Sequence, residues 1–110
     1  MKVKFYLKAS GRSLVEDFLK GCSDGIKADF YDAVALLSAG TTLSLPLSRN
    51  LSSIHGGLHE LRLKDRTGQI RIFYFVKKAD GIYLLHAFKK KTEELPKQEV
   101  DLALKRIKEI

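Results

Sequence analysis

Apolar and polar residues alternate through the second half of the chain, from Leu58 to Lys91. This stretch contains three apolar-rich runs of strand length, and the short loops between the runs end at Gly68 and Gly81. Glycine readily adopts the positive φ angles that hairpin turns require, so these breaks are typical of antiparallel strand connections. The pattern therefore predicts a three-stranded meander that carries basic residues inside its strands.

The residues before the meander predict one strand and two helices. In residues 2–8, three apolar residues alternate with three lysines and Tyr6, which predicts a strand. Ser13 and Glu16 have the spacing of a capping box, which indicates the start of a first helix. A second repeat at helical spacing ends at Gly40, where a C-terminal glycine cap is expected. We expect these helices to form a hairpin.

Two further segments complete the chain. Residues 41–57 hold several serines, one proline and a glycine pair, yet leucines recur among them, which favours an ordered loop packed on the body. Pro96 can serve as the first residue of a helix whose apolar side includes Val100 and Ile107. We therefore expect one α+β domain over residues 1–110, with the order β-α-α-β-β-β-α, a twisted and mainly antiparallel sheet, and the helices packed on one face.

The composition describes a basic globular protein. The chain has 110 residues, a formal charge of +7 and 45% hydrophobic residues, which is enough apolar surface for a core. Nucleic acid is the first partner to consider, although an excess of lysine could also serve only solubility. A single cysteine, Cys22, and the lack of a signal peptide or a membrane-length apolar run predict a cytoplasmic protein without a membrane partner.

The charged residues inside the meander are the candidate site. Side chains alternate along a strand, so Glu60 and Arg62 share one face of the first meander strand, and Arg71 can meet them from the second. Two converging guanidinium groups suit a phosphate. The alternative is that Glu60 forms a surface ion pair with one arginine, which would contribute about 0–1 kcal/mol and no chemistry. The run Lys89–Lys91 could add positive charge, although such runs are often only solvated.

Four motifs follow one another in the second half of the chain. They are Gly57-Leu58-His59-Glu60-Leu61-Arg62, Arg71-Ile72-Phe73-Tyr74-Phe75, Leu84-Leu85-His86-Ala87-Phe88-Lys89-Lys90-Lys91-Thr92, and Pro96-Lys97-Gln98-Glu99-Val100 with Ala103. In this order, and after a helical hairpin and a leucine-bearing loop, they make the chain resemble the RelE/HigB-type toxins, especially the phage-related branch. The resemblance covers nearly the whole chain.

The resemblance implies a RelE-like fold and the toxin of a bacterial toxin-antitoxin system. Such a toxin is an mRNA interferase, an endoribonuclease that cuts mRNA on the 70S ribosome and uses no metal or other cofactor. Its partner would be a cognate antitoxin of the HigA-like or RelB-like kind. Residues carried over by position as catalytic are Arg62, Arg71 and Lys90, with the neighbouring Lys89 as the alternative to Lys90. Residues that we assign to RNA or ribosome binding are Lys89, Lys91, Lys64 and Lys77.

The chemistry of RNA cleavage agrees with these residue types. The 2′-hydroxyl can attack the adjacent phosphorus, so a protein must align the nucleophile and neutralise the phosphorane. We expect Arg71 to hold the scissile phosphate bidentately, and Arg62 to bind either a neighbouring phosphate or the negative charge that develops in the reaction. Glu60 and His86 compete for proton transfer. Glu60 could instead only orient Arg62, and His86 could equally face the core, because alternation groups it with apolar neighbours.

Two other functions remain open at this stage. The ParE branch of the same superfamily acts on topoisomerase, and its induction would cause DNA damage instead of mRNA cleavage. A noncatalytic double-stranded RNA-binding module also combines three antiparallel strands with a final helix that follows basic residues. The chain departs from the nuclease pattern at Glu93-Glu94-Leu95, which replaces a more basic stretch, and Glu60 fits the HigB side of the family better than the RelE side.

Overall fold

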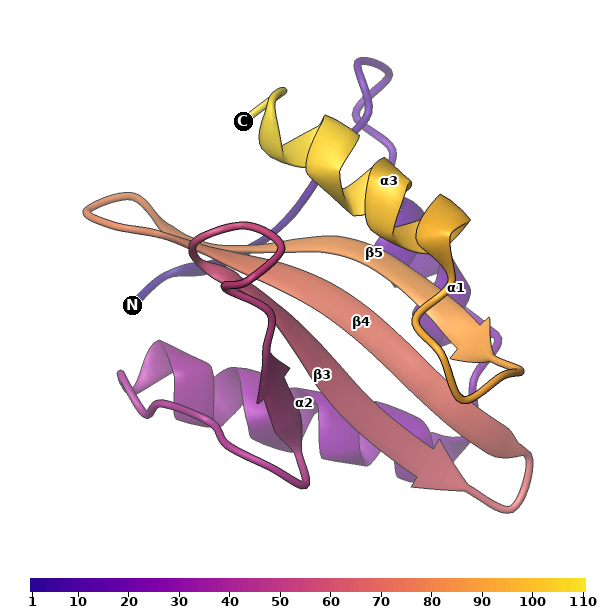
Figure 1. Ribbon diagram of the computed structural model, residues 1–110. Helices are drawn as coiled ribbons and strands as arrows, with labels where there is room; N and C mark the ends of the chain where they lie inside the picture. Colours follow the sequence, from indigo (N-terminus) through magenta and orange to yellow (C-terminus); the bar gives the residue numbers. More distant parts are fainter.

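Five strands form one sheet in the order β1-β5-β4-β3-β2 in the computed structural model, which describes residues 1–110 (Figure 1). The strands are β1 (Val3–Phe5), β2 (Ser48–Asn50), β3 (Leu58–Asp65), β4 (Gly68–Lys77) and β5 (Gly81–Lys90). Strands β3, β4 and β5 are the predicted meander, in which each strand runs antiparallel to the next. Strand β1 pairs with β5 in parallel. The α+β class is thereby confirmed, with a mixed sheet.

Glycines make the two hairpins possible. Gly68 and Gly81 both have positive φ, at 145° and 142°, in a region that other residues rarely adopt. Gly81 also lies against the parallel strand β1, because a Cβ atom added there would approach the backbone oxygen of Lys2 to 2.6 Å. A side chain at position 81 would therefore push β1 away from β5.

Three helices complete the fold, and they are α1 (Leu14–Lys20), α2 (Asp24–Ser38) and α3 (Lys97–Ile107). Ser13 is the N-cap of α1, as the predicted capping box requires, since its hydroxyl accepts a hydrogen bond of 3.1 Å from the backbone N–H of Glu16. Gly40 has the positive φ expected of a C-terminal cap. Pro96 precedes the first residue of α3, so it stands one position earlier than predicted.

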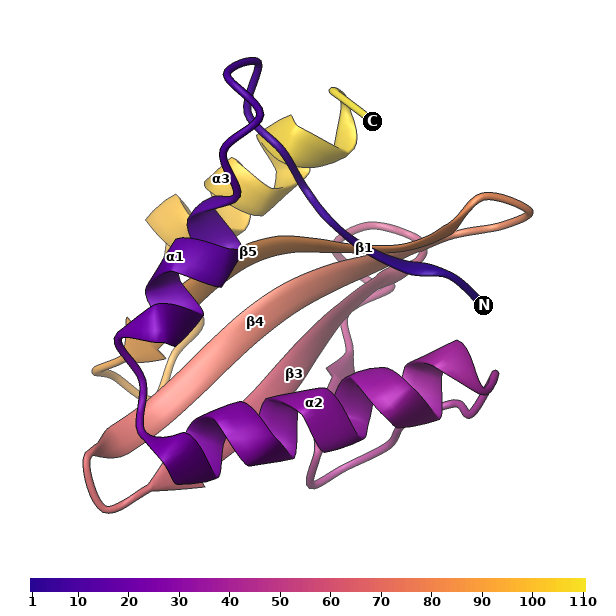
Figure 2. The same cartoon turned by 180° about the vertical axis from the view of Figure 1, so that it is seen from behind.

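The helices cover both faces of the sheet. Helices α1 and α2 lie together on one face, whereas α3 lies on the other (Figures 1 and 2). The expectation of helices on one face thus holds for α1 and α2 but is wrong for α3. The physical reason lies in β4 and β5, whose apolar runs are continuous instead of alternating. Ile72 packs toward α1 and α2, while its neighbour Phe73 packs toward α3.

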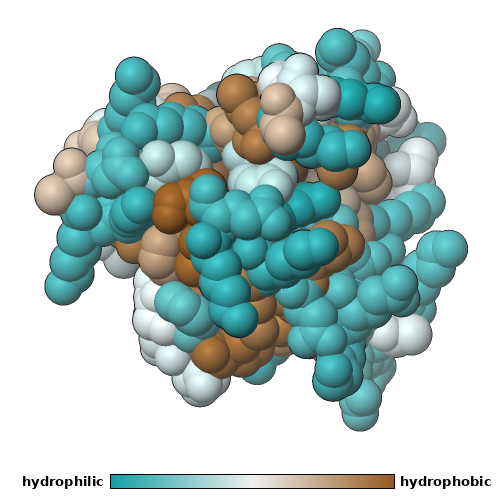
Figure 3. All heavy atoms as spheres, turned by 90° about the horizontal axis from the view of Figure 1, so that it is seen from above, coloured by the Kyte–Doolittle hydropathy of each residue, from teal (hydrophilic) through white to brown (hydrophobic).

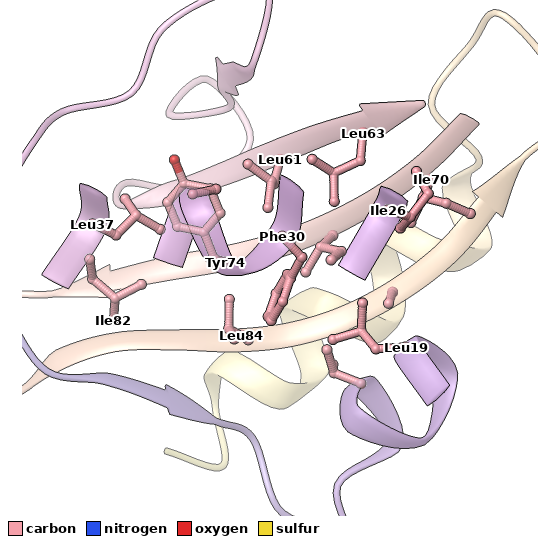
Figure 4. Close-up of a cluster of buried hydrophobic side chains, with 14 residues drawn as sticks. Leu19, Ile26, Phe30, Leu37, Leu61, Leu63, Ile70, Tyr74, Ile82 and Leu84 are labelled. Atoms are coloured by element: carbon pink, nitrogen blue, oxygen red, sulfur yellow. The ribbon is translucent and has the colours of Figure 1, made fainter. Parts of the chain in front are cut away.

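Two apolar clusters result from this arrangement. The larger one fills the space between α1, α2 and the sheet, and Figure 4 shows Phe30 of α2 among side chains of β3, β4 and β5. Its labelled members are Leu19, Ile26, Phe30, Leu37, Leu61, Leu63, Ile70, Tyr74, Ile82 and Leu84. The smaller cluster joins α3 to Phe73, Leu85 and Phe88 on the opposite face. The sheet is therefore the central layer of the molecule.

The segment between α2 and β3 is ordered, as predicted, and contains the short strand β2. Leu51 is buried in the smaller cluster, and Leu47 packs against the larger one. The backbone N–H of Arg62 donates a hydrogen bond of 2.8 Å to the Leu47 carbonyl oxygen. This contact fixes the loop beside β3, next to the charged residues of that strand.

Hydrophilic side chains dominate the face of the molecule seen from above, with smaller hydrophobic areas between them (Figure 3). No lysine is buried, so the lysines that contribute to the positive charge of the chain are accessible to solvent. None of the helices is both long and apolar enough to cross a membrane.

The hydrogen bonds to Asp65, at the turn between β3 and β4, predict that the stability of the fold depends on pH. The Asp65 carboxylate accepts hydrogen bonds from the hydroxyl of Ser23 and from the Thr67 hydroxyl and backbone N–H, which lowers the pKa of Asp65 from 3.8 to about 2. A depressed folded-state pKa stabilises the protein above the unfolded value, and that contribution is lost as the pH falls toward 2.

We therefore expect Asp65→Asn to reduce the acid sensitivity of the fold. Urea unfolding at about pH 5 and about pH 2.5 measures this, and the wild-type midpoint should fall further between the two pH values than the variant midpoint. Equal losses in both proteins would show that Asp65 is not the responsible carboxylate.

Candidate nucleic-acid interface

The strand register arranges side chains in three rows on the sheet face that α3 partly covers. Each row crosses β3, β4 and β5 in turn, and the rows are Glu60-Phe73-His86, Arg62-Arg71-Phe88 and Lys64-Gln69-Lys90. Phe73 and Phe88 pack under α3 in the smaller apolar cluster. Lys64 and Gln69 are exposed, so the third row faces solvent. The uncovered part of this face is therefore polar and mainly basic.

Arg62 and Arg71 face each other directly across β3 and β4, with Glu60 beside them. Glu60 is only 1% exposed and Arg71 only 4%. The carboxylate lies 3.9 Å from Nε of Arg62 and 3.8 Å from Nε of Arg71, distances that make ion pairs but not hydrogen bonds. The expected pairing of Glu60 with an arginine is thus confirmed, although the pair is buried instead of lying on the surface, and the carboxylate contacts both arginines.

The electrostatics of this trio favour an anion. Two guanidinium groups oppose one carboxylate, so a net positive charge remains. Burial lowers the pKa of Arg71, the Glu60 charge opposes that shift and Arg62 adds to it, while a guanidinium stays protonated in proteins. Three atoms of the trio, Glu60 Oε2 and the two Nε atoms, are buried without a hydrogen-bond partner. A buried group of charges contributes little net stability to a fold, so the arrangement of these three side chains is better explained by binding of an anion than by stability.

Gln69 is a site residue that the sequence did not reveal. Its Oε1 accepts a hydrogen bond of 2.7 Å from Nη2 of Arg71, while Nη1 of the same arginine donates to the Ile70 carbonyl oxygen at 3.2 Å. These two bonds fix the plane of the guanidinium. An uncharged glutamine in a strand carries no sequence signal, except that it lies two positions before Arg71 and so shares its face.

Two hollows flank the arginines. One, of about 350 Å³, has Lys64 and Arg71 on its lining together with the apolar residues Pro46 and Leu47. The other, of about 640 Å³, has no hydrophobic lining residue and includes Lys90 and Lys91. Arg62 and Gln69 line both hollows, so the two hollows are neighbours.

The predicted basic residues do not all meet at this place. Lys64, Lys90 and Lys91 line the hollows. Lys89 is aligned with Ile70, which packs in the core under α1 and α2, so Lys89 belongs to the opposite face of the sheet. Lys77 stands at the other end of β4, where it forms an ion pair of 3.5 Å with Asp80.

His86 lies under α3 and away from the arginines. Its side chain is 14% exposed and its Nε2 contacts the carboxylate of Glu99 on α3. Nη1 of Arg106 lies 3.3 Å from the other ring nitrogen and also donates a hydrogen bond of 2.6 Å to the Leu85 carbonyl oxygen. Phe73 separates His86 from Glu60 in their common row. A bulge beside Phe73 shifts the pairing of β4 and β5. Leu84 therefore packs on the sheet face toward α1 and α2, although simple alternation would place it on the same face as His86.

No group of three or more His, Cys, Asp or Glu side chains is placed to hold a metal ion. The fold and the paired arginines together define a small, basic α+β protein with a candidate anion site on its sheet. The chain belongs to the family of phage-derived Gp49-like proteins (DUF891), whose family model matches residues 17–108. This RelE-related, toxin-like family is associated with the toxins of toxin-antitoxin systems. No curated protein matches the chain.

Proposed function

We propose that this chain is a RelE/HigB-type mRNA endoribonuclease that cuts mRNA on the 70S ribosome without a metal, and that a cognate antitoxin neutralises it. Membership of the Gp49-like family supports a toxin and hence an antitoxin partner. The observation that carries the finer proposal is the facing pair Arg62 and Arg71 around the buried Glu60. A pair of guanidinium groups on one sheet face is suited to a phosphodiester.

In this mechanism Arg71 binds the scissile phosphate. One N–H of each terminal nitrogen is engaged by Ile70 and Gln69, which leaves the others free to donate to phosphate oxygens. Arg62, facing it, stabilises the negative charge that develops as the 2′-hydroxyl attacks phosphorus. Fixed donors of this kind lower the barrier because they need no reorganisation during the reaction.

The protons are handled by groups around this pair. Glu60 lies beside the facing arginines and contacts both, and its burial supports a role in holding them in place. Lys90 lines the larger hollow with Arg62, where its ammonium group can give a proton to the 5′-oxygen as the bond from that oxygen to phosphorus breaks, while a solvent water takes the proton of the attacking 2′-hydroxyl. The contacts of His86 with Glu99 and Arg106 support a structural role in anchoring α3.

The test is the integrity of mRNA in a translating bacterial extract, mapped by primer extension. The proposal expects discrete cuts that appear only when ribosomes are present. Intact mRNA with normal translation would contradict the nuclease, and DNA damage on induction would instead indicate action on topoisomerase. Addition of the co-expressed neighbour protein, if it is the antitoxin, should suppress the cuts.

Two adjacent lysines provide a matched test of where RNA binds. Lys90 belongs to the face with the arginines and Lys89 to the opposite face. We expect Lys90→Ala to lower the cleavage rate about tenfold or more, whereas Lys89→Ala should stay within about twofold of the wild type. Rates of mRNA cutting in the same extract measure this. Equal losses in both variants would indicate a diffuse charge effect instead of a site.

A further inference from the structure

We propose that the two hollows divide the substrate between them, with the Pro46 hollow taking a nucleobase of single-stranded RNA and the Lys91 hollow taking the backbone phosphate next to the scissile one. The inference rests on the proposed function and specifies how the same site holds its RNA. The bound RNA would then cross the sheet along a path from the loop before β2 to the end of β5.

The first hollow has the surface of a base pocket. Pro46 and Leu47 give it an apolar wall, and its volume of about 350 Å³ lies in the range of small-ligand sites. Lys64 and Gln69 bring polar groups to the same hollow, where they can bond the edge of a base. A base reaches such a pocket only when it is unstacked, as it is in single-stranded RNA.

The second hollow has the surface of a phosphate site. No hydrophobic residue lines it, so a base would find no apolar surface there. Arg62, Lys90 and Lys91 bring three positive charges, against one carboxylate from Glu93. Lysine and arginine that neutralise phosphates contribute affinity independent of sequence.

The residues that line both hollows position the bond to be cut. Arg62 and Gln69 line both hollows, and Gln69 holds Arg71 by its side-chain oxygen. A phosphate bound by Arg62 and Arg71 would therefore have its base on one side and the next phosphate on the other. Neighbouring β-strands lie about 5 Å apart, so β3 and β5 are about 10 Å apart. A short stretch of extended single-stranded RNA can span this distance.

Two exposed lysines separate the roles of the hollows. Lys64 lines only the first hollow and Lys91 only the second, and both substitutions to alanine remove one positive charge. We expect Lys64→Ala to change the nucleotide preference at one position beside the cut, by about tenfold between favoured and disfavoured bases. Lys91→Ala should weaken cutting at all sites equally and reduce the salt dependence of RNA binding by about one phosphate contact. Identical cleavage maps and salt dependence in the two variants would overturn the division.

A binding experiment tests the same inference without relying on cleavage. Amide chemical shifts of the purified protein are followed while a single-stranded RNA trinucleotide is added, and again with one base removed. The intact trinucleotide should shift the amides of Leu47 and Lys64 together with those of Lys90 and Lys91, and removal of the base should abolish only the first pair of shifts. Shifts that are absent, or that survive base removal in both hollows, would refute the base pocket. RNA binding without cuts in the extract would overturn only the proposed nuclease.

Discussion

Arg71→Ala should abolish growth inhibition and reduce ribosome-dependent mRNA cutting by about a hundredfold to a thousandfold. This is the loss seen when one preorganised donor to a developing anion is removed. Arg71 is the arginine whose guanidinium is fixed by two hydrogen bonds, and its side chain is buried, so its donors are held in place before the substrate binds. Growth after induction and cleavage rates in the extract measure the effect.

Arg71→Lys is the informative companion. A lysine keeps the positive charge but offers a point donor in place of a planar fork, so it should restore little of the lost activity if the phosphate is bound bidentately. Circular dichroism and thermal unfolding must show that each variant is folded. A folded Arg71→Ala protein with undiminished toxicity would remove the proposed role of this residue.

Glu60→Leu should lower the free energy of unfolding by about 3 kcal/mol. The substitution leaves the buried guanidinium of Arg71 without its opposing charge, and an uncompensated buried charge is among the most destabilising changes known in proteins. Urea unfolding followed by circular dichroism gives the value, and Lys64→Leu on the same strand is a control for loss of charge at an exposed position.

A second substitution separates the charge effect from packing. Replacing both members of a buried ion pair by apolar side chains is often neutral, so Glu60→Leu combined with Arg71→Met should recover much of the stability that Glu60→Leu loses. The double variant would still be inactive. Additive losses instead of recovery would mean that Glu60 stabilises the protein through something other than its arginine contact.

The regular elements could be predicted because their signals are local. Alternation and glycine located β3, β4 and β5, and Ser13 located α1. Strand β2 was missed because it has three residues in a serine-rich and leucine-bearing segment and takes its conformation from β3. The face chosen by α3 could not be read either, since helical periodicity shows which side of a helix is apolar but not which sheet face receives it.

The candidate site shows the same division. Alternation alone brings Arg62 and Arg71 to one face, and the register confirms that they are opposite each other. The burial of Glu60, the hydrogen bond from Arg71 to Gln69, and the separation of Lys89 from Lys90 all depend on which residues face across strands. A sequence specifies that register only through the whole fold.

Strand β1 pairs in parallel with β5, so it can meet its partner only after most of the chain has been synthesised. Lys4 and Asp80, which meet where these strands join, are separated by 76 positions. Contacts between such distant segments form late, because their loop-closure entropy must be met before they contribute. During synthesis the pairing of β1 with β5 must therefore wait until β5 has left the ribosome, whereas Arg62 and Arg71 belong to a hairpin of neighbouring segments. The two arginines can thus face each other before β1 completes the edge of the sheet.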